Sequence, residues 1–302
     1  MIERLKKVKL KANESFNFRE GWLRKGMRCV SDCSTLFSQD DVMERLGVGS
    51  KMVKSIRFWL QATALCEEQY ASGGRGKEQV ITEYFGQVIA EFDPYFEDMF
   101  TLFLLHYHIV SNENLCMVWN IFFNEYRGED FTRESMEEIC SDLLTRKMES
   151  GATFSEKLFN DDCYSVIKMY LNTVTAEDPE ESLACPLSEL GLIQKSSKVK
   201  NSFIKKAPNR EILDNLVILY VIVDNLKEGK NSVGIDDLLN APNNIGRVFN
   251  LNRVLINEYL DQLRISGYIT INRTAGLDMI YVETNMTPKD IMIEYYTKAQ
   301  VQ

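Results

Sequence analysis

The chain is short of the residues on which most catalytic and metal-binding motifs depend. Only two of its 302 residues are histidines, His106 and His108, and they lie two positions apart in an apolar segment. On a helix this spacing turns the two side chains about 200° from each other, so they cannot share a ligand. Because they lie inside an apolar helix, core histidines are favoured over catalytic ones. No P-loop, GxSxG or GxGxxG motif is present either. We therefore expect no catalytic residues, no cofactor and no metal site.

Proline and long apolar runs are scarce as well. Six prolines, with abundant Leu, Ile, Met and Glu, favour helix over strand. No run approaches the roughly 18 apolar residues that a membrane span requires, and the basic start, residues 1–11, lacks the apolar core of a signal peptide. We expect a cytoplasmic protein with no membrane partner.

The seven cysteines are scattered and odd in number, which argues against a disulfide framework. Without a secretory signal they are expected to be reduced thiols, several of them in the core. Cys29 and Cys33 form a CxxxC, but no second pair or nearby histidine completes a zinc site. Cys185 could handle sulfur, but a buried structural thiol is favoured.

Negative charge predominates, but it is unevenly distributed. The net charge is −9, yet residues 1–60 hold thirteen Lys or Arg against seven Asp or Glu, a net of +6, so the remainder carries −15. Residues 195–210 contain six basic residues and no acid. These basic patches, rather than the average charge, are what a polyanionic partner would meet. The stretch 195–210 is either a segment that follows a phosphate backbone or a solvated linker.

The N-terminal pattern predicts a winged helix-turn-helix. The expected elements are, in order, a helix around Trp22, a short helix over 40–46 with Ser38 as its cap, a turn at Gly47 and Gly49, a helix over 51–65 with Ser50 as its cap, and strands over 66–70 and 79–82. A glycine-rich basic loop joins the two strands. Helix, turn, helix and hairpin follow one another in the order of a winged helix.

The helix over 51–65 is the predicted DNA-reading element. Val53, Ile56 and Leu60 share its apolar face, and Phe58 is expected on the outer face. Base edges and phosphates present mostly acceptors, so donors on the outer face and in the loop suit DNA. The predicted DNA-binding residues are Ser50, Lys51, Lys54, Ser55, Arg57, Gln61, Arg75 and Lys77. The alternative is a solvated face on a helix that only packs, or a protein-binding module.

Further along, apolar helices fill the middle of the chain, and a short helix, a longer helix and a hairpin over 267–283 repeat the opening pattern. The predicted fold is mainly α, with winged helix-turn-helix domains at the N- and C-terminal ends joined by a helical middle region. The predicted domains are 1–90, 91–185 and 186–302. Asp93, Glu97 and Asp98 could be magnesium ligands of a nuclease, but charges at a helix start are favoured.

Four stretches together resemble one bacterial family. They are "FNFREGWLRKG" (16–26), "LGVGSKMVKSIRFWLQA" (46–62), "DPYFEDMFTLFLLHYHI" (93–109) and "CPLSELGLI" (185–193). The family is catalogued as a domain of unknown function, number four thousand and seven. Its members tend to be encoded beside proteins resembling phosphoadenosine-phosphosulfate (PAPS) reductase and beside ATPases, in loci for DNA phosphorothioation and phage defence. The resemblance implies a DNA-associated accessory protein.

Residues and resemblance together predict a non-catalytic DNA-binding accessory protein of a DNA-modification or phage-defence system. Its expected partner is double-stranded DNA, contacted through the N-terminal winged helix. The alternative is an interaction subunit that binds an ATPase or a PAPS-reductase-like protein and does not touch DNA.

Overall fold

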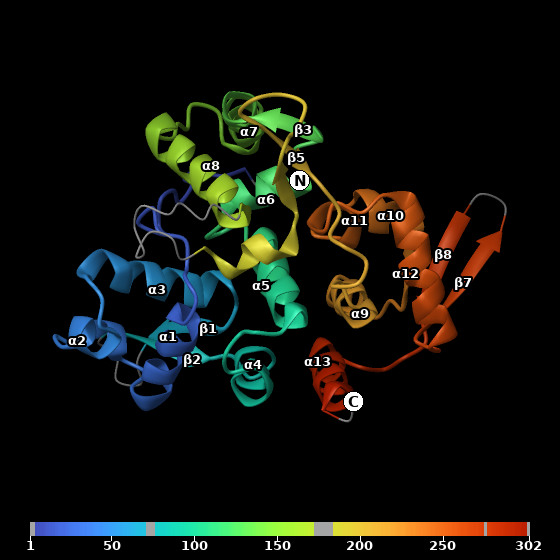
Figure 1. Ribbon diagram of the computed structural model, residues 1–302, viewed down its shortest axis with the longest axis horizontal. Helices are drawn as coiled ribbons and strands as arrows, with labels where there is room; N and C mark the ends of the chain where they lie inside the picture. Colours follow the sequence, from blue (N-terminus) through green and yellow to red (C-terminus); the bar gives the residue numbers. More distant parts are fainter. Residues whose placement is uncertain (1–3, 71–75, 172–183, 275–276, 301–302) are drawn as a thin grey trace.

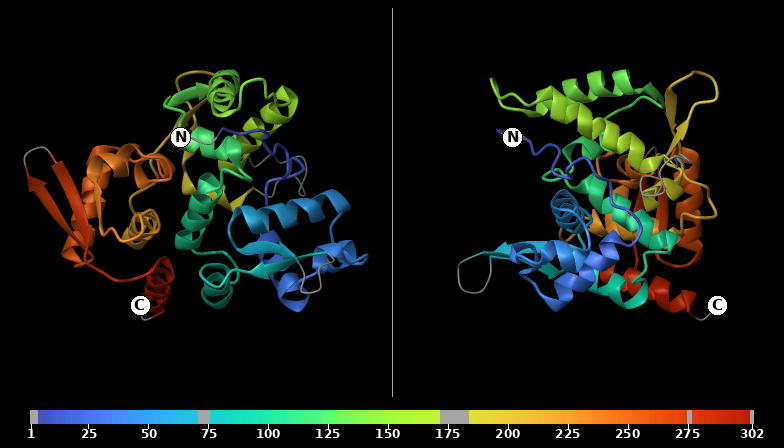
Figure 2. Two further views of the ribbon diagram at one scale, coloured as in Figure 1. Left: turned by 180° about the vertical axis from the view of Figure 1, so that it is seen from behind. Right: turned by 60° about the vertical axis from the view of Figure 1, so that its left-hand side comes forward.

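The computed structural model describes residues 4–70, 76–171, 184–274 and 277–300. The N-terminal elements lie on one side of the molecule and most C-terminal elements on the other, with the middle of the chain between them (Figure 1). The view from behind shows the same order (Figure 2). The last helix, α13, returns to the centre, where it contacts α9 and α4. Both ends of the chain therefore contribute to one continuous core.

Three helices and a hairpin open the fold. They are α1 (Trp22–Asp32), α2 (Val42–Leu46), α3 (Ser50–Ala62), β1 (Cys66–Tyr70) and β2 (Lys77–Ile81). α1 packs closely on α3 at Gly26, where a Cβ atom would lie 2.9 Å from Cγ2 of Ile56. Trp59 of α3 is fully buried and meets Trp119 of the middle region edge to face, with ring centroids 5.7 Å apart. This aromatic contact joins the N-terminal unit to the core.

The middle of the chain is mostly helical but contains its own sheet. Its elements are α4 (Gly86–Phe92), α5 (Met99–Ser111), α6 (Met117–Asn124), β3 (Asp130–Thr132), α7 (Arg133–Lys147), α8 (Glu156–Tyr170), a 3₁₀ turn (Pro186–Leu190), β4 (Ile193–Lys195) and β5 (Ser202–Lys205). α5 is apolar on almost every side and is buried between α6 and α9, as an all-round apolar helix requires. The strands form an antiparallel sheet in the order β3–β5–β4.

A second set of helices and strands completes the chain. They are α9 (Asn215–Asp224), β6 (Ser232–Gly234), α10 (Ile235–Asn240), α11 (Ile245–Val248), α12 (Arg253–Ile265), β7 (Ile269–Thr274), β8 (Leu277–Val282) and α13 (Pro288–Ala299). The strands form an antiparallel sheet in the order β6–β8–β7. The hairpin expected over 267–283 is confirmed by β7 and β8. The division into three domains stays a prediction.

The predicted fold class, mainly α with winged helix-turn-helix domains at the two ends, is wrong. The chain is an α/β fold with about 51% helix, 13% strand and three antiparallel sheets. The sheet of β3, β5 and β4 was not expected, because its strands are only three or four residues long. The basic stretch 195–210, which contains the end of β4 and all of β5, was interpreted as a linker or a DNA-tracking segment. Pairing between segments about 70 residues apart supplies the stability that such short strands lack alone.

Three local predictions about the N-terminal helices are also wrong. Ser38 does not cap α2, because it ends a short 3₁₀ turn and α2 begins at Val42. Ser50 is the first residue of α3 rather than its cap, which is Gly49. Phe58 lies in the core, with only 6% of its surface exposed, and its ring packs against Trp59.

The expected roles of the histidines and cysteines are confirmed. Burial lowers the pKa of His106 and His108 to about 3, so both rings are neutral in the core. His106 lies 2.7 Å from the Tyr170 hydroxyl and 2.7 Å from the Val248 carbonyl, which satisfies both ring nitrogens. All seven cysteines are free, and burial raises the pKa of the Cys185 thiol. Among the described residues, no helix has the length and apolar character of a membrane span.

Candidate nucleic-acid interface

Two lysines at the start of α3 are among the accessible residues of the predicted DNA-binding set. Lys51 and Lys54 are both exposed. The Lys54 ammonium lies 3.7 Å from the Glu14 carboxylate, but 68% of the lysine side chain remains exposed, so this ion pair is weak. Within the described part of the chain, no carboxylate lies within ion-pair distance of Lys51. Both cations are therefore available to a polyanion.

The two predicted serines differ in accessibility. Ser50 is exposed at the first position of α3. Ser55 is fully buried, and its hydroxyl donates to the backbone carbonyl of Phe16, 3.1 Å away. Ser55 therefore anchors the segment that precedes α1 and is not available to DNA, contrary to the sequence prediction.

Arg57 and Lys77 are held by one carboxylate. The Nε atom of Arg57 lies 2.9 Å from Oε2 of Glu68, and Nζ of Lys77 lies 2.5 Å from Oε1. Partial burial acts to raise the pKa of Glu68, but hydrogen bonds from Lys77 and Arg57 outweigh it and hold that pKa below its ordinary value. One negative charge thus offsets part of the positive charge that the sequence assigned to DNA.

The other two predicted residues add little to the described surface. Gln61 is half-buried and donates to the carbonyl of Arg57 in its own helix, at 3.2 Å. Arg75 lies outside the described residues, together with the rest of loop 71–75. Of the eight predicted residues, Ser50, Lys51, Lys54 and Lys77 are exposed. Lys77 is paired with Glu68, so Ser50, Lys51 and Lys54 form the open part of the face.

The outer side of α1 carries cations that the sequence prediction missed. Arg24, Lys25 and Arg28 are exposed, and no carboxylate in the described ranges lies within ion-pair distance of them. The Lys25 ammonium lies 3.0 Å from the position that a Cβ atom on Gly47 would take, so it sits beside the turn that leads into α3. The spacing of these three residues was visible in the sequence, but the position of Lys25 beside the turn before α3 depends on how α1 packs against α2 and α3. We call Lys25, Ser50, Lys51 and Lys54 the N-terminal cationic face.

The C-terminal half offers fewer free cations on its long helix. Arg253 at the start of α12 binds both Asp236 and Asp278, at 2.5 and 3.1 Å. Arg264, near the end of the same helix, pairs with Asp261 at 3.4 Å. Because both arginines of α12 are paired with aspartates, this helix offers little net positive charge to a phosphate backbone.

The basic stretch 195–210 divides into exposed cations and half-buried basic residues. Lys195, Lys198, Lys200 and Lys206 are exposed at or beside the β4–β5 hairpin. Lys205 donates to the carbonyl of Phe122, 2.9 Å away, and Arg210 stacks on the Tyr259 ring at 3.9 Å. The stretch is therefore a structured hairpin with a basic tip rather than a linker.

The carboxylates considered as magnesium ligands serve the backbone instead. Asp93 accepts hydrogen bonds from the amides of Glu97 and Asp98, at 3.0 and 3.1 Å. Asp98 caps α5 by accepting from the Phe100 amide. Across the residues that the structure describes, no group of three His, Cys, Asp or Glu side chains is placed to hold a metal ion.

These observations define the chain as an α/β protein with an accessible cationic face at its N-terminal unit. Residues 11–296 match the family described as "Protein of unknown function (DUF4007)", and the chain belongs to that family. The family suggested by the four sequence stretches is thus confirmed. No curated protein matches the chain.

Two solved structures share the fold. One is described as "SspB crystal structure", with a TM-score of 0.84 and 23% identity over 99% of this chain and 89% of that one. The other, "Magnesium ion-bound SspB crystal structure", has a TM-score of 0.83 and 22% identity over 97% and 88%. Because the likeness spans nearly the whole chain, the fold is a single arrangement shared with these proteins rather than two winged-helix domains on a helical connector.

Proposed function

We propose that this protein is a non-catalytic DNA-binding accessory protein of a DNA-modification or phage-defence system. In this proposal, duplex DNA lies on the N-terminal cationic face. The observation that carries the proposal is the exposure of Lys51 and Lys54, with Lys25 beside the turn that leads into their helix, on a chain whose net charge is −9. The association with phosphorothioation loci that the family resemblance implies supports the same role. A protein of the same fold is described as bound to magnesium, but the described carboxylates here give no support for such a site.

The acidic remainder of the chain supports an oriented mode of binding. Phosphates attract the N-terminal unit and repel surfaces rich in Asp and Glu, so a single face meets the duplex. The exposed lysines of the β4–β5 hairpin, Lys195, Lys198 and Lys200, would add sequence-independent affinity where the DNA reaches them.

Reversing the charge of both α3 lysines tests the proposal. The Lys51→Glu/Lys54→Glu variant is expected to bind duplex DNA at least about tenfold more weakly, since two phosphate contacts are lost and replaced by repulsion. The slope of log affinity against log salt should fall by roughly two. Fluorescence anisotropy with a labelled duplex over a salt series measures both quantities.

Lys227→Glu/Lys230→Glu is a matched control, because it changes charge equally at two exposed lysines with the same spacing in the loop after α9. Its affinity should stay close to that of the wild type. Equal losses in both variants would mean that only net charge matters. An unchanged affinity in the α3 variant would show that the N-terminal cationic face does not bind DNA.

Neutralising Glu68 should have the opposite effect. Glu68→Gln releases Arg57 and Lys77 from their shared ion pair. Two more cations then face the DNA, so we expect affinity to increase severalfold at low salt, with a steeper salt dependence. The same anisotropy series measures this, and Glu67→Gln, at the exposed neighbouring position, is the control. An unchanged affinity would place the DNA away from this side of α3.

The second candidate function is an interaction subunit for an ATPase or a PAPS-reductase-like protein. It is supported by two large apolar side chains on α12, Val254 and Ile265, which are 65% and 69% exposed. They are eleven residues apart, which places them about 20° from each other on one helix face. An interaction subunit without DNA contact predicts no salt-dependent DNA affinity in the titration above.

A further inference from the structure

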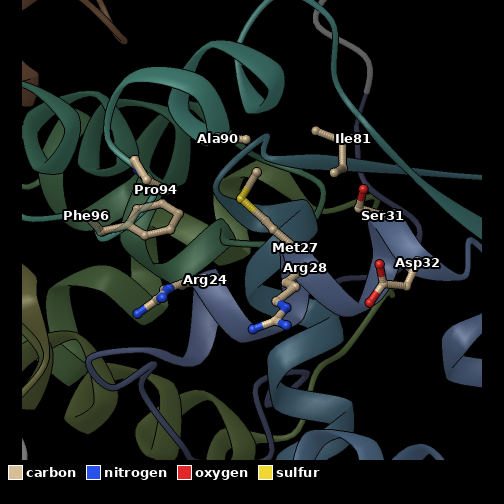
Figure 3. A pocket seen from close by; sticks show the side chains of 9 residues that line it. All are labelled: Arg24, Met27, Arg28, Ser31, Asp32, Ile81, Ala90, Pro94 and Phe96. Atoms are coloured by element: carbon tan, nitrogen blue, oxygen red, sulfur yellow. The ribbon is translucent and has the colours of Figure 1, made fainter.

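A pocket of about 290 Å³ lies between α1, β2, α4 and the turn that precedes α5 (Figure 3). Met27, Ile81, Ala90, Pro94 and Phe96 supply its apolar lining. The α1 residues that line the pocket project from a different side of the helix than Gly26, where α1 touches α3. The pocket therefore lies on the side of α1 that faces away from α3. Ligand pockets begin at roughly 300 Å³, so this one suits a single small group.

The polar side chains of the pocket are free to bind a ligand. Arg28, Ser31 and Asp32 make no hydrogen bond or ion pair within the described parts of the chain. Arg24 lies over the ring of Tyr95, with its guanidinium carbon 3.8 Å from the ring centroid. The pocket therefore combines two guanidinium groups, a carboxylate and a hydroxyl with an apolar floor.

The wall of the pocket opposite α1 is fixed in place. Phe96 has a φ of 60°, a left-handed conformation that bulky residues rarely adopt. Its amide donates to the Asp93 carbonyl at 3.1 Å, and the Asp93 carboxylate binds the next two amides. This bonding holds the Phe96 ring at the pocket (Figure 3), so the site is formed before a ligand arrives.

Cations connect the pocket to the N-terminal cationic face. Lys25 and Arg28 are three residues apart on α1, which places their side chains about 60° from each other around the helix. Lys25 in turn lies beside Gly47, in the turn before α3. A strand held by Lys25 and Lys51 would therefore pass close to Arg28 at the pocket rim.

We propose that this pocket accepts one nucleotide displaced from the DNA on that face. Arg24 and Arg28 bind its phosphate, as guanidinium groups do with two parallel hydrogen bonds. The base enters the apolar floor against Phe96, because aromatic rings stack on any base. Asp32 accepts from an exocyclic amino group at the base edge. This inference rests on the proposed DNA binding and specifies what the protein recognises there.

The test compares a fully paired duplex with one that carries a single unpaired, bulged nucleotide. An unpaired base is displaced at the least cost, so the wild type should bind the bulged duplex about tenfold or more tightly. Ala90→Trp, which fills the pocket, and Arg28→Ala, which removes a phosphate ligand, should each reduce this preference to about one. Ala90→Trp should keep its paired-duplex affinity. Arg146→Ala, an exposed arginine on α7, should keep the full preference.

The outcomes separate the two proposals. Paired-duplex binding that depends on Lys51 and Lys54 but shows no preference for the bulge overturns the pocket inference and leaves the proposed function standing. No binding to either duplex overturns both. A bulge preference that survives in both pocket variants, with melting curves showing that they are folded, places the nucleotide elsewhere. A peptide carboxylate that binds the wild type but not Ala90→Trp, without bulge preference, assigns the pocket to a protein partner instead.

Discussion

Replacing Asp93 with alanine is expected to lower the free energy of unfolding by about 4 kcal/mol, because three hydrogen bonds to a buried carboxylate are lost together. The carboxylate accepts from the amides of Glu97 and Asp98 and from the Thr101 hydroxyl. The Thr101 proton is committed to Asp93, so the Tyr296 hydroxyl of α13 must donate to Thr101, 2.6 Å away. Asp93 therefore holds the turn before α5 and supports the docking of the last helix.

Chemical denaturation followed by circular dichroism measures this effect. Asp93→Asn, which keeps one acceptor oxygen, should lose about half as much stability as Asp93→Ala. Glu91→Ala, an exposed carboxylate two residues earlier, should lose little. A similar small loss at both positions would contradict the structural role of Asp93.

The Asp93 variants also address the magnesium-nuclease alternative. The wild type with Mg²⁺ is expected to leave supercoiled plasmid intact. Plasmid cleavage by the wild type that disappears in Asp93→Asn, at a temperature where both proteins are folded, would instead assign Asp93 a role at a metal.

The second large effect is expected at Lys205 of strand β5. Its side chain forms hydrogen bonds with carbonyl groups at the end of the neighbouring helix α6. Its side-chain nitrogen, Nζ, lies 2.9 Å from the Phe122 carbonyl and 3.4 Å from those of Phe123 and Tyr126. Carbonyls in the last turn of a helix have no partner within the helix, so Lys205 satisfies groups that would otherwise lack a donor. We expect Lys205→Met, which keeps the apolar stem, to lose about 3 kcal/mol of stability near pH 10.

This loss should depend on pH. Burial lowers the pKa of Lys205 from 10.5 to about 7, so between these values the amine is neutral in the folded protein and protonated in the unfolded chain. The unfolded state then binds more protons, and the wild type gains stability as pH rises. The difference between the wild type and Lys205→Met should therefore shrink toward pH 7, by up to about 1.4 kcal/mol per pH unit.

Denaturation curves at pH 7, 8.5 and 10 measure this trend, with Lys206→Met as the exposed neighbouring control. A stability difference that stays constant with pH would mean that Lys205 remains charged in the folded protein.

Local sequence patterns predicted those features that depend on neighbours along the chain. The apolar character of residues 94–110 predicted a buried helix, and most of that stretch lies in α5, which begins five residues later, at Met99. The alternating hairpin near the C-terminus was also predicted, because strand period and turn residues are local signals. The apolar surroundings of His106 and His108 predicted core residues, and burial lowers the pKa of both.

Predictions failed where a distant segment decides the outcome. Ser55 and Phe58 were placed on an outer face by helical periodicity, but the segment before α1 and the neighbouring aromatic side chains cover them. The sheet β3–β5–β4 joins strands from residues 130–132 and 193–205, and no local pattern marks such a pairing.

The sequence alone determined the family, the segregation of positive charge toward the first 60 residues, and the helices whose apolar stripes are complete within one segment. These properties are set by residue identity and order, and they do not require the chain to fold. Only the tertiary structure decided which cations remain free. Glu68 approaches Arg57 and Lys77 through the β1–β2 hairpin, the carbonyls of α6 enclose Lys205, and Lys25 reaches the turn beside Lys51. Charge is a property of the residue, but its availability depends on which groups the fold brings within a few ångströms of it.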